Sequence, residues 1–217
     1  MLWRLRNKLR LQDLAEMFLA RGLTFSDEAV RDWEARCTPL LTERLRAKRC
    51  GQGGTKRHTD ETDSKVNGRW CFLYRAIDRE GKLVDARRSP TRDMDAAQRF
   101  FRQAHALAGV APERVTTDGH DAYPRAIRET LGLGTRHRTS RYEHNRIAQD
   151  HRRVKQRHDP MRGFGSFASA ARFCSAFAEQ RHYSRAVTRS GEVVLPAARR
   201  PAFRERRVTI VTGVAAA

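Results

Sequence analysis

The stretch from Val115 to Pro124 constrains the fold of this chain more than any other. Its first three residues, Val115-Thr116-Thr117, are β-branched and favour a short, mostly buried strand. Asp118-Gly119 then allows a turn, and Pro124 stands where a helix can begin, because a first helical turn needs no N–H donor there. Open α/β sheets place ligands and metals at this C-terminal edge of a parallel strand. Taken alone, the stretch is explained better by an aspartate that caps a βα turn, so a functional Asp118 requires partners.

The charge of the chain predicts a polyanionic partner. The 217 residues, enough for one large or two small domains, include 44 Lys and Arg against 25 Asp and Glu, which gives a formal net charge of +19. Such an excess favours nucleic acid, and arginine makes forked contacts to phosphate. No long apolar run or amphipathic anchor favours a membrane, and the first ten residues are too charged for a secretory signal. We therefore expect a cytoplasmic, nucleoid-associated protein without a membrane partner.

The cysteines favour neither a zinc ribbon nor a disulfide framework. No C-x-x-C or Cys/His finger spacing occurs, and free thiols in a reducing compartment are the simplest interpretation. The four are widely and irregularly spaced: Cys37, Cys50, Cys71 and Cys174.

Two short helices are predicted near the N-terminus. Apolar residues in Leu11–Ala20 recur at helical spacing, and Ser26 is a suitable N-cap for a second helix over Asp27–Arg36. Two helices around a Gly-containing turn fit a helix-turn-helix, although any small helical hairpin has the same pattern. We assign residues 1–46 to this region and residues 47–58 to a basic linker, which is either a phosphate contact or a solvated loop.

From Thr59 the pattern changes to strands and helices of an α/β domain. The Asn67-Gly68 pair predicts a hairpin before a central strand over Arg69–Asp78. Further strands are predicted over Leu83–Arg88, at Val115 and near Thr135–Thr139, and helices over 93–108, 123–131, 145–157 and 166–184. The order β-β-β-α-β-α-β-α predicts a mixed sheet flanked by helices over residues 59–184, followed by an Arg/Pro-rich, loosely ordered tail over 185–217.

This element order is that of the ribonuclease H-like fold, and several stretches resemble one family within it. HTDETDSKVNGRWCFLYRAID, TTDGHDAYPRAIRETLG, NRIAQDHRRVKQR and MRGFGSFASAARF resemble the DDE transposases of bacterial insertion-sequence family six. LQDLAEMFLARGLTFSDEAVRDWEAR resembles the helix-turn-helix of the same family, which carries more helix ahead of it, so the region 1–46 looks truncated. The resemblance covers about Leu11 to Phe177.

The resemblance implies a transposase that binds terminal inverted repeats and catalyses metal-dependent strand nicking and transfer as a homo-oligomer. Its chemistry needs divalent metal, Mg²⁺ or Mn²⁺, held by three carboxylates. By resemblance, the first is Asp60 and the second is Asp118. The third position, within N-R-I-A-Q-D-H, is Ala148, where the family has glutamate. Alanine cannot ligate a metal, and Glu143 and Asp150 lie on other faces of the predicted helix.

Catalysis is therefore expected to be impaired. Polar residues around Asp60 also depart from the family pattern, and together these changes suggest a decayed copy. The alternative is a DNA-binding relative without catalysis, an inhibitor or a remnant; an unrelated third hypothesis is a basic RNA-binding protein. Candidate DNA-binding residues are basic residues of the hairpin and the late helix: Lys65, Arg146, Arg152, Arg153, Lys155 and Arg157.

Overall fold

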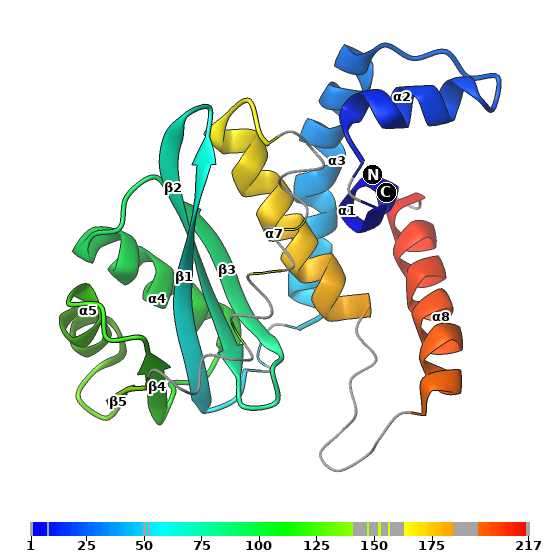
Figure 1. Cartoon of the computed structure of the whole chain (residues 1–217). Helices are drawn as coiled ribbons and strands as arrows, with labels where there is room; N and C mark the ends of the chain where they lie inside the picture. The colour runs from blue at the N-terminus through cyan, green and yellow to red at the C-terminus, as the bar shows by residue number, and fades with distance from the viewer. Residues whose placement is uncertain are drawn as a thin grey trace.

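A single mixed sheet of five strands is the centre of the computed structural model, which describes residues 2–7, 9–49, 51, 53–140, 147, 152, 156, 163–184 and 195–215 (Figure 1). The strands are β1 (Lys56–Val66), β2 (Arg69–Asp78), β3 (Leu83–Ser89), β4 (Arg114–Thr117) and β5 (Arg136–Thr139). Their order in the sheet is β3-β2-β1-β4-β5. Strand β2 runs antiparallel to both β1 and β3, whereas β1, β4 and β5 are parallel to one another. The predicted ribonuclease H-like α/β fold is confirmed.

The predicted hairpin between β1 and β2 turns at Asn67 and Gly68. Their φ angles are 47° and 76°, and positive φ at both central residues is what a tight hairpin turn with the twist of the strands requires. The pairing places Val66 opposite Arg69 and Asp60 opposite Arg75. A one-residue slip would exchange the two faces of β1, so this turn decides which face Asp60 occupies.

One face of the sheet is covered by α4 (Met94–Ala108) and α5 (Ala122–Leu131). Helix α4 begins at Asp93, whose side chain accepts a hydrogen bond from the Ala96 N–H at 2.7 Å. Aromatic rings fill the space between these helices and β2, with ring centroids 5.5 to 5.8 Å apart; the rings are those of Tyr74, Phe100, Phe101 and Tyr123.

The opposite face is covered by α7 (Phe167–Ser184), which packs against the long helix α3 (Asp27–Ala47). Leu41 and Leu45 of α3 share a buried cluster with Leu73 of β2 and with Phe173 and Phe177 of α7. The predicted helix over 27–36 is thus too short. The helix continues through Pro39, because the apolar stripe of α3 goes on for two more turns against α7.

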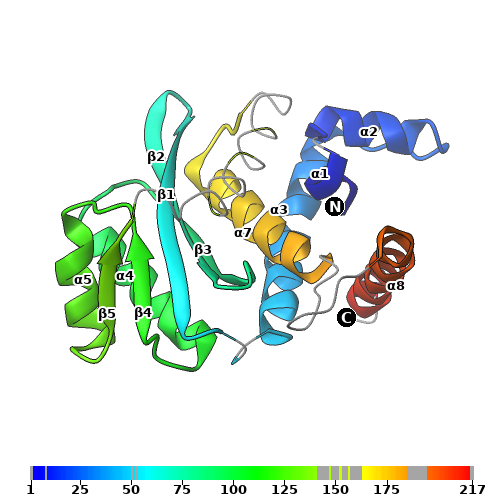
Figure 2. The ribbon, with the colours of Figure 1, turned by 60° about the horizontal axis from the view of Figure 1, so that its bottom comes forward.

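Two short helices precede α3, and one helix follows the sheet domain. The short helices are α1 (Leu2–Asn7) and α2 (Leu11–Leu19), and α8 spans Pro196–Ala215. Figure 2 shows α8 on the same side of the sheet as α1, and two cation–π contacts join these helices. The Arg207 guanidinium lies 4.6 Å from the Trp3 ring centroid, and that of Arg6 lies 4.1 Å from the Phe203 ring centroid.

The N- and C-terminal regions differ from prediction in three respects. No helix was predicted at 2–7, and the loosely ordered tail predicted over 185–217 contains α8. Strand β1 begins at Lys56, inside the predicted linker 47–58, because Lys56 and Arg57 pair with β4. Within the described ranges, no helix combines the length and the apolar character needed to span a membrane.

Candidate metal centre

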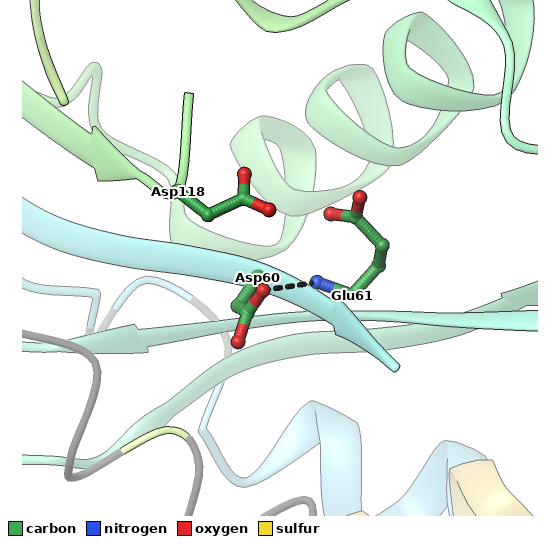
Figure 3. A group of neighbouring side chains, drawn as sticks. All are labelled: Asp60, Glu61 and Asp118. Atoms are coloured by element: carbon green, nitrogen blue, oxygen red, sulfur yellow. Dashed lines mark hydrogen bonds between the residues drawn. The ribbon is translucent and has the colours of Figure 1, made fainter. Parts of the chain in front are cut away.

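Asp60 and Asp118 come from neighbouring parallel strands. His58 of β1 pairs with Thr116 of β4, so two residues further on Asp60 stands beside Asp118, which directly follows β4. The structure thus brings together two acids that have 57 residues between them in the sequence. One carboxylate oxygen from each lies within 4.8 Å of the other (Figure 3).

The turn after β4 holds Asp118 in place. The Asp118 carboxylate accepts a hydrogen bond from the His120 N–H at 3.2 Å. Gly119 has a φ of 94°, and a Cβ added there would come within 2.6 Å of Thr139 Cγ2 on β5. Glycine is therefore required at this position both for its backbone conformation and for the close approach of β5.

Glu61 is a third carboxylate beside Asp60 and Asp118, and the sequence pattern did not predict it; these three residues are called the acidic group below. Its carboxylate oxygen lies within the same 4.8 Å of those of Asp60 and Asp118. Successive residues of a strand point to opposite faces, so alternation predicts Asp60 and Glu61 on different sides of β1. Figure 3 shows the Glu61 carboxylate facing that of Asp118, while the Asp60 carboxylate accepts the Glu61 N–H at 2.9 Å. The adjacent Asp-Glu pair was the only available signal.

Glu61 lies in an environment that disfavours its charge. Its side chain is 3% exposed, and burial, followed by the negative charge of Asp118, raises the pKa of Glu61 to about 7. The Tyr123 hydroxyl donates a hydrogen bond to one oxygen, and the Arg92 guanidinium pairs with the other. Glu61 is thus held toward the α4 and α5 face of the sheet.

Arg92 connects the acids electrostatically. It lies between β3 and α4, pairs with Glu61, and its Nη2 is 3.5 Å from Asp118 Oδ2. Its side chain is 36% exposed whereas that of Glu61 is 3% exposed, so the pair is open to solvent on the arginine side only. Its positive charge offsets the repulsion between the carboxylates. A divalent cation bound there would offset the same repulsion in place of Arg92.

Several other predicted residues lie away from this group or outside the described residues. Lys65 is exposed near the hairpin tip, with its Nζ 4.9 Å from the Trp70 ring centroid. Five residues of strand separate it from Asp60, roughly 16 Å. Ile147 is helical and fully buried, and Arg152 is helical and exposed. The remaining predicted positions lie outside the described residues: Arg146, Ala148, Arg153, Lys155 and Arg157.

A family model and several known proteins that resemble this chain all belong to one family of transposases. A family model described as a DDE domain, of the IS240 transposase type, matches residues 54–187. The chain is 32% identical over 157 residues to the transposase for insertion sequence element IS257 in transposon Tn4003 of Staphylococcus aureus, covering 70% of this chain and 69% of that protein. The transposase for insertion sequence-like element IS431mec of the same species matches to the same extent.

Solved structures with a similar arrangement are viral integrase cores. The catalytic core domain of HTLV-2 integrase, in complex with magnesium, has a TM-score of 0.47 at 14% identity and covers 66% of this chain and 95% of that one. The catalytic core domain of BIV integrase has a TM-score of 0.42 at 12% identity, with 72% and 98% covered.

Proposed function

Because this chain belongs to the DDE transposases of bacterial insertion-sequence family six, we propose that it binds terminal inverted repeats in double-stranded DNA and that its acidic group is the remnant of a strand-transfer site. The convergence of Asp60 and Asp118 at one edge of the sheet carries this proposal. The net charge of +19 supports a DNA partner. Acting on DNA also implies a site of action at the bacterial nucleoid.

The residues present suit a hard divalent cation. Carboxylate oxygens are the ligands that Mg²⁺ and Mn²⁺ prefer, and oxygens from three carboxyl groups lie within 4.8 Å of one another. Asp60 and Asp118 would hold the ion, with Glu61 beside them. When bound, such an ion supplies an activated oxygen nucleophile and stabilises charge at the phosphorus. The contribution of the chain is to hold its carboxylates at the edge of a rigid sheet, where a DNA phosphate can approach.

The third family position argues for impaired catalysis. Ala148 offers no oxygen, and the loss of one metal clamp removes several kcal/mol of transition-state stabilisation. Each 1.36 kcal/mol corresponds to about tenfold in rate. Glu61 does not replace the missing glutamate in this proposal, because Tyr123 and Arg92 already occupy its two carboxylate oxygens.

A nicking assay tests this function. The parent protein and its Ala148→Glu variant are incubated with Mg²⁺ and a duplex that carries the terminal repeat. We expect no nicking by the parent and nicking by Ala148→Glu that Asp118→Asn abolishes in the double variant. Nicking by the parent that Asp118→Asn alone abolishes would show that the conclusion about Ala148 is wrong.

A second candidate function is DNA binding without catalysis, as an inhibitor that occupies terminal repeats or enters oligomers of active transposase. Ala148 favours it, and so does the ion pairing of Arg92 with the acids, which satisfies the group without a metal. In this function α2 and α3 would act as a helix-turn-helix, and basic residues such as Lys65 and Arg152 would contact phosphates. Repeat binding by a parent that never nicks, even as Ala148→Glu, would support this function.

A further inference from the structure

An arginine-lined pocket lies among the N-terminal helices and the start of α7, and its lining does not include the acidic group. It has a volume of about 490 Å³ and lies between the start of α2, the first turns of α3 and the loop that leads into α7. Arginines from four separate elements line it: Arg4, Arg10, Arg31 and Arg172. We name it the arginine pocket.

The charge of the arginine pocket is positive. Its acidic lining residues are Asp27 and Glu34, so four arginines face two acids. Arg4 and Glu34 neutralise each other, since Arg4 Nη1 donates to Glu34 Oε1 at 2.5 Å and both side chains are buried. Arg10 and Arg31 pair with acids outside the pocket lining, Asp13 at 2.7 Å and Glu28 at 3.3 Å. Arg172 has no acidic partner within the part of the chain that the structure describes.

Two of the arginines retain donor capacity inside the protein. The Nε atoms of Arg4 and Arg172 are buried and have no hydrogen-bond acceptor within the part of the chain that the structure describes. The Arg4 side chain is only 7% exposed and lies 5.3 Å from the Phe173 ring centroid. Both Nε atoms are closed off from the pocket, so an anion there would meet the other guanidinium nitrogens of its arginines.

The start of α7 adds a second source of positive potential. Gly165 and Ser166 line the pocket directly before this helix of 18 residues. The Ser169 N–H donates to Ser166 Oγ at 3.2 Å, while the remaining N–H groups of a first turn have no acceptor within their helix. A Cβ built on Gly165 would meet no atom within 4 Å, so the backbone is open toward a ligand.

We propose that the arginine pocket binds a phosphate group of the DNA backbone. A tetrahedral dianion or phosphodiester offers several acceptor oxygens to forked guanidinium groups and helix N–H donors. The inference rests on the proposed DNA-binding function and adds a defined contact to it. This contact joins α2 and α3 to α7, the helix behind the acidic group, so DNA held by the N-terminal helices would also touch the catalytic domain.

A charge-matched pair of variants tests the pocket. Arg31→Gln removes a pocket arginine, and Arg125→Gln removes one from α5; both side chains are exposed, 57% and 72%, and each pairs with a glutamate on its own helix. Binding of a terminal-repeat duplex is followed by fluorescence anisotropy over a salt series. Loss of one phosphate contact weakens binding roughly fivefold to tenfold near 0.1 M salt and lowers the salt slope by about one.

We expect this change for Arg31→Gln and parent-like binding for Arg125→Gln. Equal binding curves for the two variants would overturn the pocket while leaving DNA binding intact. A parent that bound no duplex would overturn the proposed function and this inference together.

A second pair keeps the arginines and blocks the pocket. Gly165→Glu places a carboxylate where there is open space, and Gly165→Gln adds the same volume without charge. We expect Gly165→Glu to bind DNA more weakly than Gly165→Gln at equal thermal stability. Inorganic phosphate is titrated in parallel and should raise the Tm of the parent more than that of Gly165→Glu. A phosphate effect lost in Gly165→Glu with unchanged DNA binding would assign the pocket to free phosphate and contradict the DNA source.

Discussion

At the scale of single residues, the site depends on the balance of charge among three acids and one arginine. Asp60, Glu61 and Asp118 repel one another at separations within 4.8 Å, and Arg92 reduces that repulsion. Burial raises the pKa of Glu61 to about 7 and so already removes part of one negative charge. We therefore expect Glu61 to act on a bound cation more through its negative charge than through a direct bond.

Glu61→Gln is expected to weaken Mn²⁺ binding about tenfold. A unit charge about 5 Å from a divalent ion contributes more than 1 kcal/mol even at the dielectric constant of water. Isothermal titration calorimetry gives the dissociation constant. Asp63→Asn, which removes an exposed acid two residues further along β1, is the control and should bind Mn²⁺ as the parent does. An equal effect of both substitutions would argue against a local role of Glu61.

At the scale of elements, the turn between β4 and α5 sets the position of Asp118. Gly119→Ala is expected to lower the free energy of unfolding by about 1–3 kcal/mol, because alanine must adopt a positive φ there and its Cβ would meet Thr139 at 2.6 Å. The same variant should lose Mn²⁺ affinity, since the turn carries Asp118. Gly134→Ala is the control, with no atom within 4 Å of the added Cβ. Urea denaturation in which both variants match the parent would contradict this account of the turn.

The junction of α3, β3 and α7 contains a buried ion network. Glu179 on α7 accepts hydrogen bonds from Arg46 at 3.0 Å and from Arg49 at 2.6 Å. Asp85 on β3 is fully buried, and its Oδ1 lies 3.5 Å from Arg46 Nη2. Neither Asp85 oxygen has a hydrogen-bond donor among the described residues. Burial raises the pKa of Asp85 to about 6, against the lowering effect of Arg46 and Arg49.

Asp85→Asn should make stability less dependent on pH. A carboxyl group whose pKa is raised in the folded state from 3.8 to about 6 contributes stability that is complete below pH 3.8 and is lost as the pH rises through about 6. At 1.36 kcal/mol per pH unit, the loss is at most about 3 kcal/mol. Urea unfolding of the parent should show this fall relative to Asp85→Asn, and Glu43→Gln, an exposed acid on α3, should follow the parent. If the free energies of unfolding of the parent and Asp85→Asn changed with pH in the same way, the raised pKa of Asp85 would be contradicted.

The sequence predicts the elements whose signals are local. The Asn67-Gly68 turn, the capped start of α4 and the Asp118 turn all follow from residues within a few positions, and the structure has each of them. Glu61 was missed because strand alternation predicts its side chain on the opposite face of β1 from that of Asp60. Its side chain is long enough to bring the carboxylate near the other two acids, where it pairs with Arg92. The length of α3 and the helix α8 were missed because they depend on packing against α7 and α1, which no local pattern reports.

At the scale of the whole molecule, the acidic group and the arginine pocket lie on different parts of one connected body. Helix α3 spans the N-terminal helices and the sheet domain, and Arg49 at its end donates to the Val84 carbonyl of β3 at 2.7 Å. The predicted boundary between a region 1–46 and a domain 59–184 is therefore bridged by packing and ion pairs. The family relationship, the charge of +19 and the two sites together support a DNA-binding transposase relative.

The central claim is that Asp60 of β1 and Asp118, at the carboxyl end of β4, hold a divalent cation. A crystal of the parent protein soaked in Mn²⁺ and measured at the manganese absorption edge tests it most directly. We predict an anomalous difference peak in contact with the carboxylates of both Asp60 and Asp118, and no such peak in Asp118→Asn. If crystals soaked at saturating Mn²⁺ showed no anomalous peak between these two side chains, the claim of a cation site would be contradicted.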